Sequence, residues 1–253
     1  MVWRKGLLIK IKKKFGINGH MFAWIADLIT DRTFQVRIGD EHLDIYILEN
    51  GTSQGSIISP TLFLMMINDM PNSLSSTSVS LFADDSTFFK PGPNIIWLQR
   101  AVQKDLDVLQ HWCNTWGFKI STEKTVGVLL THSTNRPNIK IEVGGSPINI
   151  KHSARFLGMI FDKSLTWSEH IEYVINKCNK RLNLMKAVSG TRWGANETSL
   201  LTIYKMLIRL ILDYGAAAYD SASISQLRKL DKIQYSALTV SYTHLTLPTI
   251  LRV

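Results

Sequence analysis

The sequence predicts an α+β fold in which a mixed part, up to about residue 165, precedes a helical part. Short segments of alternating polarity, bounded by Gly, Asn and Asp, recur before residue 165 and are typical of β-hairpins. A helical spacing of apolar residues interrupts them over residues 95–117 and dominates after residue 166. With 253 residues, 45% of them hydrophobic, the chain can bury a core as one large domain or two smaller ones.

The first sixty residues predict two helices and a hairpin. Residues 3–14 form a short basic segment with apolar residues on one helical face, and "HMFAWIADLITD" shows the same spacing. "TFQVRIGDEHLDIYIL" alternates and carries Gly39-Asp40 near its centre, which indicates a turn between two strands. A further helix is expected from Pro60, because proline suits the first helical turn.

The later elements show the same two patterns, alternating polarity for strands and helical spacing of apolar residues for helices. "SSTSVSLFADDSTFF" predicts a strand, a tight acidic turn and a strand, and the helix over 95–117 ends at Gly117. Two more hairpins are expected, one around Gly144-Gly145 and one in "ARFLGMIFDKSLTW". Thr166 with Glu169 has the spacing of a capping box at a helix start. The helices expected in this part span residues 168–187, 196–214 and 222–238.

Charge and cysteine content limit the function classes. The net charge of +9, from 29 Lys and Arg against 20 Asp and Glu, favours a polyanionic partner. Cys113 and Cys178 lie in apolar helical patterns, so we interpret them as core thiols rather than a disulfide or metal pair. The apolar segment 200–219 carries a charged stripe and is no membrane span, and no secretory signal is visible. We expect an intracellular protein, in the nucleus or cytoplasm, that is not secreted and does not act at a membrane; its oligomeric state stays open.

Two adjacent acids interrupt a strand-like segment at Asp84 and Asp85. Like charges in a half-buried setting repel, and removing them from water is costly. Taken alone, the pair is best explained as an ordinary hairpin turn, where Asp is common. Its sequence neighbours change that interpretation.

Four ordered blocks around this pair resemble the reverse transcriptases of non-LTR retrotransposons, particularly the jockey-like group. "GTSQGSIISPTLFLMMINDMP" is similar to the family's QGSxLSPxLFxxxINDLP block, and "SLFADDS" to its acidic turn. "GFKISTEKT" resembles the NxxKT block, with Ser121 in place of Asn, and "ARFLGMIFDKSLTWSEHI" resembles the turn that grips the primer. The resemblance spans roughly residues 1–240, and several motifs in matching order are far more specific than one.

The resemblance implies a polymerase palm, an antiparallel sheet with packed helices, over residues 1–165, and a helical thumb or connection over 166–239. The fingers would be missing. It implies an RNA-directed DNA polymerase that copies an RNA template onto a DNA primer with deoxynucleoside triphosphates. Asp84 would be the direct ligand of two Mg²⁺ ions, with Mn²⁺ as an alternative, and Asp85 the supporting acid. Such paired cations stabilise the attacking and leaving oxygens of nucleotidyl transfer, and they would offset the repulsion between the two acids.

Other site residues are likewise implied by the resemblance. Lys124 would act as a catalytic residue on the departing pyrophosphate, although a surface lysine is an equally good interpretation. For the serine-rich loop, the alternative is an ordinary helix-initiating turn. The residues implied to contact the nucleotide and template are Ser53, Gln54, Gly55, Ser56 and Phe82.

The resemblance also implies nucleic-acid contacts in the second half of the chain. Phe156, Leu157 and Gly158 would form the primer grip, although their apolar character also suits a plain core hairpin. Along the helix over 168–187, cations away from the apolar face would follow a phosphate backbone. A solvated helix face would look the same. These cations are Lys177, Lys180, Arg181 and Lys186.

Two departures from the family pattern lead to further expectations. The first polymerase motif, which carries a third catalytic Asp, would lie upstream of Met1, so the chain as given is expected to have no polymerase activity. The alternative function is a non-catalytic nucleic-acid-binding remnant of the polymerase scaffold. Residues 240–253, "VSYTHLTLPTILRV", fit no preceding helix and are interpreted as a non-native tail.

Overall fold

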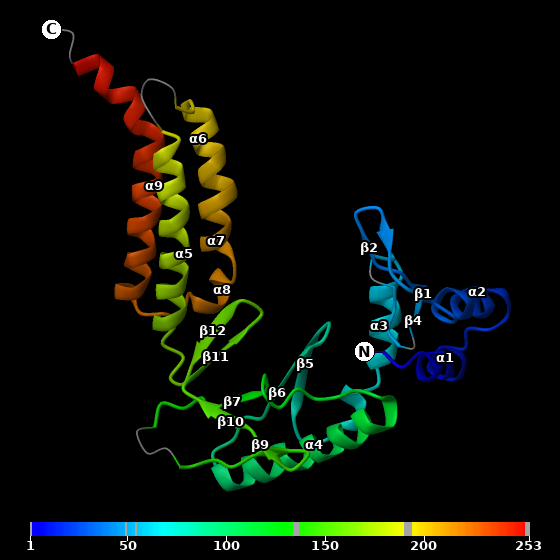
Figure 1. Cartoon of the computed structure of the whole chain (residues 1–253). Helices are drawn as coiled ribbons and strands as arrows, with labels where there is room; N and C mark the ends of the chain where they lie inside the picture. The colour runs from blue at the N-terminus through cyan, green and yellow to red at the C-terminus, as the bar shows by residue number, and fades with distance from the viewer. Residues whose placement is uncertain (1, 49, 54, 134–136, 190–193, 251–253) are drawn as a thin grey trace. The chain divides into compact units, whose positions relative to one another are not determined.

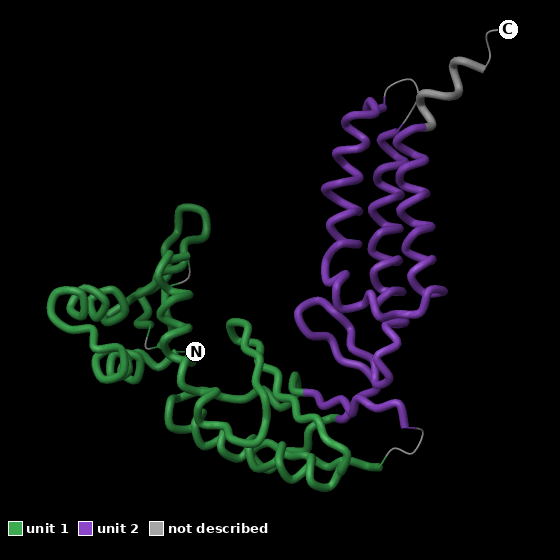
Figure 2. The backbone as a smooth tube through the Cα atoms, turned by 180° about the vertical axis from the view of Figure 1, so that it is seen from behind, with its two compact units in different colours: residues 1–125, 137–149 green, residues 126–136, 150–253 purple. Residues whose placement is uncertain are grey.

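The computed structural model describes residues 2–48, 50–53, 55–133, 137–189 and 194–250 (Figure 1). They form two compact units, residues 1–125 with 137–149 and residues 126–136 with 150–253 (Figure 2). Helices and short strand pairs alternate in the first unit, and long helices dominate the second. The predicted α+β class is therefore confirmed, whereas the palm and thumb division at residue 165 stays a prediction.

Three helices build one core of the first unit: α1 (Arg4–Lys13), α2 (Gly19–Ile29) and α3 (Ser59–Ile67). Each helix contributes two fully or nearly buried apolar residues at helical spacing to this core. These residues are Leu7, Ile11, Ile25, Ile29, Leu62 and Met66. Proline at position 60 lies in the first turn of α3, where its missing N–H costs no hydrogen bond.

A long, exposed hairpin follows α2. Its outer strands are β1 (Thr33–Phe34) and β4 (Tyr46–Ile47), and its inner strands are β2 (Arg37–Ile38) and β3 (Glu41–His42). Gly39, with φ of +63°, allows the tight turn between β2 and β3 that the sequence predicts.

The longest helix of the first unit, α4 (Ile95–Trp116), begins and ends on specific residues. The Asn94 side chain accepts hydrogen bonds from the amides of Ile96 and Trp97, and Gly117 ends the helix with φ of +71°. The 3₁₀ turn η1 (Pro71–Ser73) and four strands complete this unit. The strands are β5 (Ser78–Phe82), β6 (Asp85–Phe89), β8 (Glu142–Val143) and β9 (Ser146–Pro147).

The second unit packs long helices beside short strands. Its strands are β7 (Val126–Val128), β10 (Asn149–Lys151), β11 (Ser153–Phe156) and β12 (Met159–Asp162). Its helices are α5 (Ser168–Ala187), α6 (Glu197–Ile203), the π-helical η2 (Tyr204–Arg209), α7 (Leu210–Asp213), α8 (Ala216–Tyr219) and α9 (Ile224–Ile250). One apolar core joins α5, the α6–η2–α7 helix and α9, which lie side by side in Figures 1 and 2. The helices expected at 168–187 and 196–214 are confirmed, the second with a π-helical segment. The helix expected at 222–238 forms as α9 but continues to Ile250, so residues 240–250, expected to fit no preceding helix, extend one.

Two further local expectations were wrong. The resemblance implied one antiparallel sheet, but the strands of the described residues form separate two-stranded pairs, most of them closed by their own short turn. The expected capping box of Thr166 and Glu169 does not form at α5, whose first residue is preceded by Trp167. Instead, the Asp162 carboxylate accepts hydrogen bonds from the amides of Ser164, Thr166 and Trp167, and Trp167 itself has a left-handed conformation.

Cys113 and Cys178 are buried free thiols, as expected. In the part of the chain that the structure describes, no helix has the length and apolar content needed to cross a bilayer.

Candidate active site

The two acids lie at the tip of the β5–β6 hairpin. The register pairs Phe82 with Asp85, so Ala83 and Asp84 form a two-residue turn, with Ala83 at φ of +51°. Both acids are exposed, and neither forms a hydrogen bond or ion pair through its carboxylate within the described residues. The turn therefore presents free carboxylate oxygens.

One face of this hairpin packs against α4. Val79, Leu81 and Phe88 are half-buried against an apolar cluster that includes Leu106 and Leu109. Asp85 lies on the other face of the hairpin. There it is paired across the two strands with Phe82, whose side chain is 62% exposed. The hairpin thus holds the acids away from the core while its other face anchors them.

A buried acid on α4 adds a polar anchor that the sequence analysis missed. Asp105 is 2% exposed and accepts hydrogen bonds from the amides of Ser75, Ser76 and Thr77 at 3.3, 2.9 and 2.7 Å. The Thr77 hydroxyl donates a fourth bond at 2.7 Å. Burial alone would raise the pKa of this carboxyl, but the hydroxyl and amide donors outweigh it and lower the pKa. The segment entering β5 is thereby tied to α4.

The donor set of the acidic turn suits a hard divalent cation, because Mg²⁺ prefers carboxylate oxygens. Within the described residues, however, no three His, Cys, Asp or Glu side chains gather as a metal-binding group. Asp84 and Asp85 would hold such an ion together with oxygens from substrate, water or another segment.

The serine-rich loop leads directly into α3 in the same unit. The Ser59 hydroxyl donates to the Ser53 carbonyl at 2.6 Å, and the Ser56 amide donates to the same carbonyl at 3.3 Å. Gly55 has φ of +83° with open space around it, so its backbone conformation, rather than crowding, requires glycine. Gln54 lies outside the described residues.

Lys124 lies in the exposed turn that follows α4. The Thr125 amide and hydroxyl both bond to the Ser121 carbonyl, at 3.0 and 2.7 Å, which closes this turn. Lys124 forms no ion pair within the described residues. The structure places it in the first unit with the acidic turn, and its catalytic role stays a prediction.

The expected primer grip is the turn between β11 and β12 in the second unit. Phe156 pairs with Met159, and Leu157 and Gly158 form the loop between them. The Tyr214 hydroxyl donates to the Leu157 carbonyl at 2.6 Å. The turn is therefore held by the end of α7, a contact that the sequence analysis did not anticipate.

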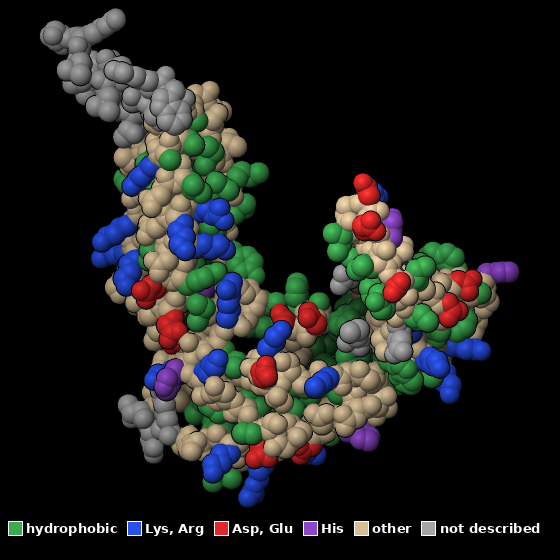
Figure 3. Space-filling view, viewed as in Figure 1, with side chains coloured by type: hydrophobic (Ala, Val, Ile, Leu, Met, Phe, Trp, Pro, Cys, Tyr) green, Lys and Arg blue, Asp and Glu red, His purple; other side chains and the backbone are tan. Residues whose placement is uncertain are grey.

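The four α5 cations predicted to bind a phosphate backbone are all exposed, and none has a carboxylate partner within the described residues. Lys177 lies 6.0 Å from the centroid of the Tyr173 ring. Arg155 of β11 lies over the same ring at 5.0 Å and donates to the Tyr173 hydroxyl at 3.0 Å. Arg155, held by Tyr173, thus extends the cationic surface of α5 to the hairpin. Figure 3 shows Lys and Arg side chains along the helices of this unit.

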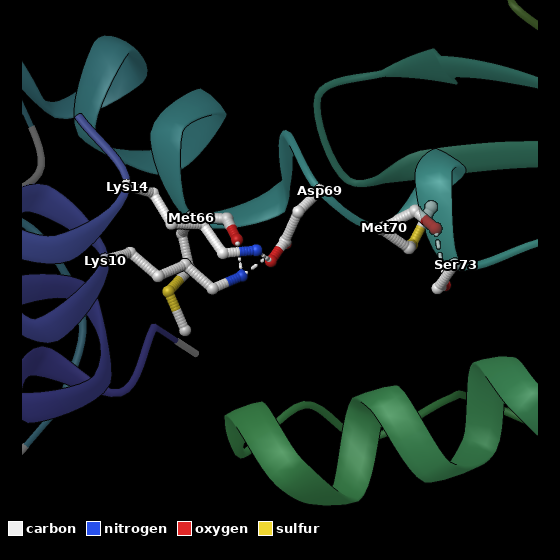
Figure 4. Close-up of polar contacts among 6 residues, drawn as sticks. All are labelled: Lys10, Lys14, Met66, Asp69, Met70 and Ser73. Carbon is white, nitrogen blue, oxygen red and sulfur yellow. Dashed lines mark hydrogen bonds and ion pairs between the residues drawn. The ribbon is translucent and has the colours of Figure 1, made fainter.

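A buried lysine joins α1 to the end of α3 (Figure 4). Lys10, 1% exposed, donates to the Met66 carbonyl at 2.6 Å and pairs with Asp69 at 2.5 Å, and Lys14 pairs with the other oxygen of Asp69. The Lys10 ammonium also lies 3.9 Å from the Trp116 ring centroid. Burial would raise the pKa of Asp69, but both lysines outweigh it and lower that pKa. A polar recess of about 310 Å³ lies beside Lys14 and Asp69.

The sequence did contain signals for two of the missed anchors. Asp105 falls between Val102 and Leu109 at helical spacing, so its carboxylate occupies the apolar face of α4. Lys10 follows Leu7 by three residues and lies on the buried face of α1. Charged residues at such positions indicate a specific buried partner.

Comparisons with known proteins identify the family to which this sequence is similar. Residues 2–161 match the family described as "Reverse transcriptase (RNA-dependent DNA polymerase)". The chain is 28% identical over 245 residues to "RNA-directed DNA polymerase from mobile element jockey" of Drosophila melanogaster, with 94% of this chain and 26% of that protein covered. It is 26% identical over 251 residues to "Probable RNA-directed DNA polymerase from transposon BS" of the same species, with 94% and 27% covered. The chain therefore spans about a quarter of the length of these relatives.

Proposed function

The chain belongs to the reverse transcriptase family, and from this premise we propose that it supplies part of the RNA-directed DNA polymerase of a non-LTR retrotransposon. The acidic turn carries this proposal. Asp84 and Asp85 are exposed acids whose carboxylates have no partner in the described part of the chain, and they lie on a hairpin whose other face packs on α4. Their place in the family's acidic block, together with this exposure, favours metal binding over an ordinary turn.

In this proposal Asp84 is the direct metal ligand and Asp85 the supporting acid. Divalent cations bound there, Mg²⁺ or Mn²⁺, would stabilise the attacking and leaving oxygens of nucleotidyl transfer at the primer 3′ end. Phe82, opposite Asp85, and the loop residues Ser53 to Ser56 would position the nucleotide and template. Lys124 would neutralise charge on the departing pyrophosphate.

The proposed substrates are an RNA template, a DNA primer and deoxynucleoside triphosphates, and the proposed place of action is inside the cell, in the nucleus or cytoplasm. The Phe156–Gly158 turn would contact the primer strand. The exposed cations of α5, which lack carboxylate partners within the described residues, would follow the phosphate backbone.

The test is Mg²⁺-dependent primer extension by this chain, alone and fused to the segment of the jockey polymerase that precedes the matched region. We expect the fusion to show template-directed extension that Asp84→Asn abolishes and that Asp107→Asn, at an exposed acid of α4, leaves intact. Extension that survives Asp84→Asn would contradict the proposal.

A second candidate function is nucleic-acid binding without catalysis, favoured by the exposed cations of α5, which have no carboxylate partner among the described residues. The two candidates differ in one result. Binding of a primer–template by the fusion, with no extension at any Mg²⁺ or Mn²⁺ concentration, would favour the binding protein.

A further inference from the structure

The turn at the expected primer grip has an unfavourable backbone conformation. Leu157 and Gly158 both have positive φ, +47° and +82°, as in the two-residue hairpin turns that favour Asn-Gly. Gly158 tolerates this region, whereas a leucine there brings its Cβ too close to the backbone. A turn selected for stability alone would carry Asn or Gly at position 157.

Packing does not explain the leucine. Leu157 is only half-buried and belongs to none of the apolar clusters formed by the described residues, although Met159 and Phe161 of the same hairpin pack against the helical core. Strain that the core does not require is more often found at contact and active sites.

Tyr214, at the end of α7, holds this conformation. Its hydroxyl donates to the Leu157 carbonyl at 2.6 Å, and its ring would lie 3.4 Å from a Cβ placed on Gly158. The next residue, Gly215, approaches Met159 so closely that a Cβ there would lie 2.7 Å from the methionine sulfur. The "LDYG" segment therefore supports the turn from the helical side (Figure 1).

We propose that Tyr214 is a positioning residue that holds Leu157 in its strained conformation, so that the leucine side chain contacts the nucleic-acid strand. The inference rests on the proposed function of the turn as a primer contact. It assigns the strain at Leu157 to recognition rather than folding, and it gives the tyrosine of the "LDYG" segment a role in binding.

The experiment compares thermal stability with binding of a fluorescein-labelled RNA–DNA duplex that has a recessed DNA 3′ end, measured by fluorescence anisotropy. Leu157→Asn should raise the Tm by about 2–4 °C, because asparagine tolerates the left-handed region. The same substitution should weaken duplex binding about fivefold. Tyr214→Phe, which removes only the hydroxyl, should lower the Tm slightly and weaken binding about threefold, as expected for one lost hydrogen bond.

Two matched controls lie in the same unit. Leu165, at φ of +52°, is another leucine in the left-handed region, so Leu165→Asn should also raise the Tm but leave binding unchanged. Tyr235 is 77% exposed on α9, and Tyr235→Phe should change neither quantity. If Leu157→Asn and Tyr214→Phe bind the duplex as tightly as the chain without substitutions, the inference about Tyr214 and Leu157 is overturned, but the primer-contact function is not. A chain without substitutions that binds no duplex would overturn the primer-contact function as well.

Discussion

Replacement of Asp105 tests how the acidic hairpin is anchored. Its carboxylate accepts four hydrogen bonds from the segment that enters β5. Bonds to a charged acceptor contribute about 1.5–3 kcal/mol each, but burial of the carboxylate offsets several kcal/mol. Asp105→Ala leaves three amides and a hydroxyl without this acceptor and should lower the free energy of unfolding of this unit by about 3–5 kcal/mol.

Asp105→Asn removes the negative charge but keeps nearly the same side-chain shape. The amide keeps one acceptor oxygen, but its NH₂ group faces backbone donors, so we expect a loss of about 2–4 kcal/mol. Urea unfolding at pH 7, followed by circular dichroism, measures both variants. Asp107→Asn is the control, because Asp107 is exposed on the same helix and accepts one bond from Gln103. An Asp105→Asn chain within about 0.5 kcal/mol of the original chain would refute this reasoning.

The pH dependence gives an independent check. The pKa of Asp105 is lower in the folded chain than in the unfolded chain, so its contribution is present above the unfolded pKa of about 3.9. It is lost as the pH falls through the folded pKa. The stability difference between the original chain and Asp105→Asn should therefore shrink below about pH 4.

Three further predictions concern the buried thiols, the buried lysine and an exposed arginine. Burial raises the pKa of Cys113 and Cys178 to about 11, so at pH 8 both thiols should react with Ellman's reagent only after denaturation; rapid reaction of the folded chain would contradict their burial. Lys10→Met removes a buried ammonium from its carboxylate and carbonyl partners and should lower the free energy of unfolding by about 2 kcal/mol, seen as a lower urea midpoint; an unchanged midpoint would show that the ion pair stabilises the fold no more than a buried methionine does. Arg155→Ala should reduce the slope of log Kd against log salt for duplex binding by about 0.7–0.9, whereas Lys232→Ala, at an exposed cation of α9, should leave the slope unchanged; equal slopes in both variants would exclude a phosphate contact at Arg155.

Much of the fold was predictable because its elements are local. The helix over 95–117 followed from apolar spacing and a glycine stop, and the hairpins followed from alternation around Gly39 and Gly144. The acidic turn was predictable for the same reason, since Asp84 and Asp85 are adjacent in the chain. Only the backbone between Phe82 and Ser86 has to turn to expose them.

The anchors of the site depended on pairings across long stretches of chain. Lys10 meets Asp69 across 59 residues, and Tyr214 meets Leu157 across 57. Neither partner has a periodicity that reveals the other. The start of α5 shows the same limit at short range, because the Asp162 carboxylate, rather than the expected Thr166 box, accepts hydrogen bonds from the amides that precede the helix.

The sequence by itself determined most of the helices, the hairpin turns, the family and the place of the two acids, because each depends on neighbours within a few residues or on a motif in fixed order. Only the tertiary structure decided how those acids are held. Asp105 ties the segment before β5 to a helix about 30 residues away, and a buried carboxylate is stable there only when folding brings its donors to it.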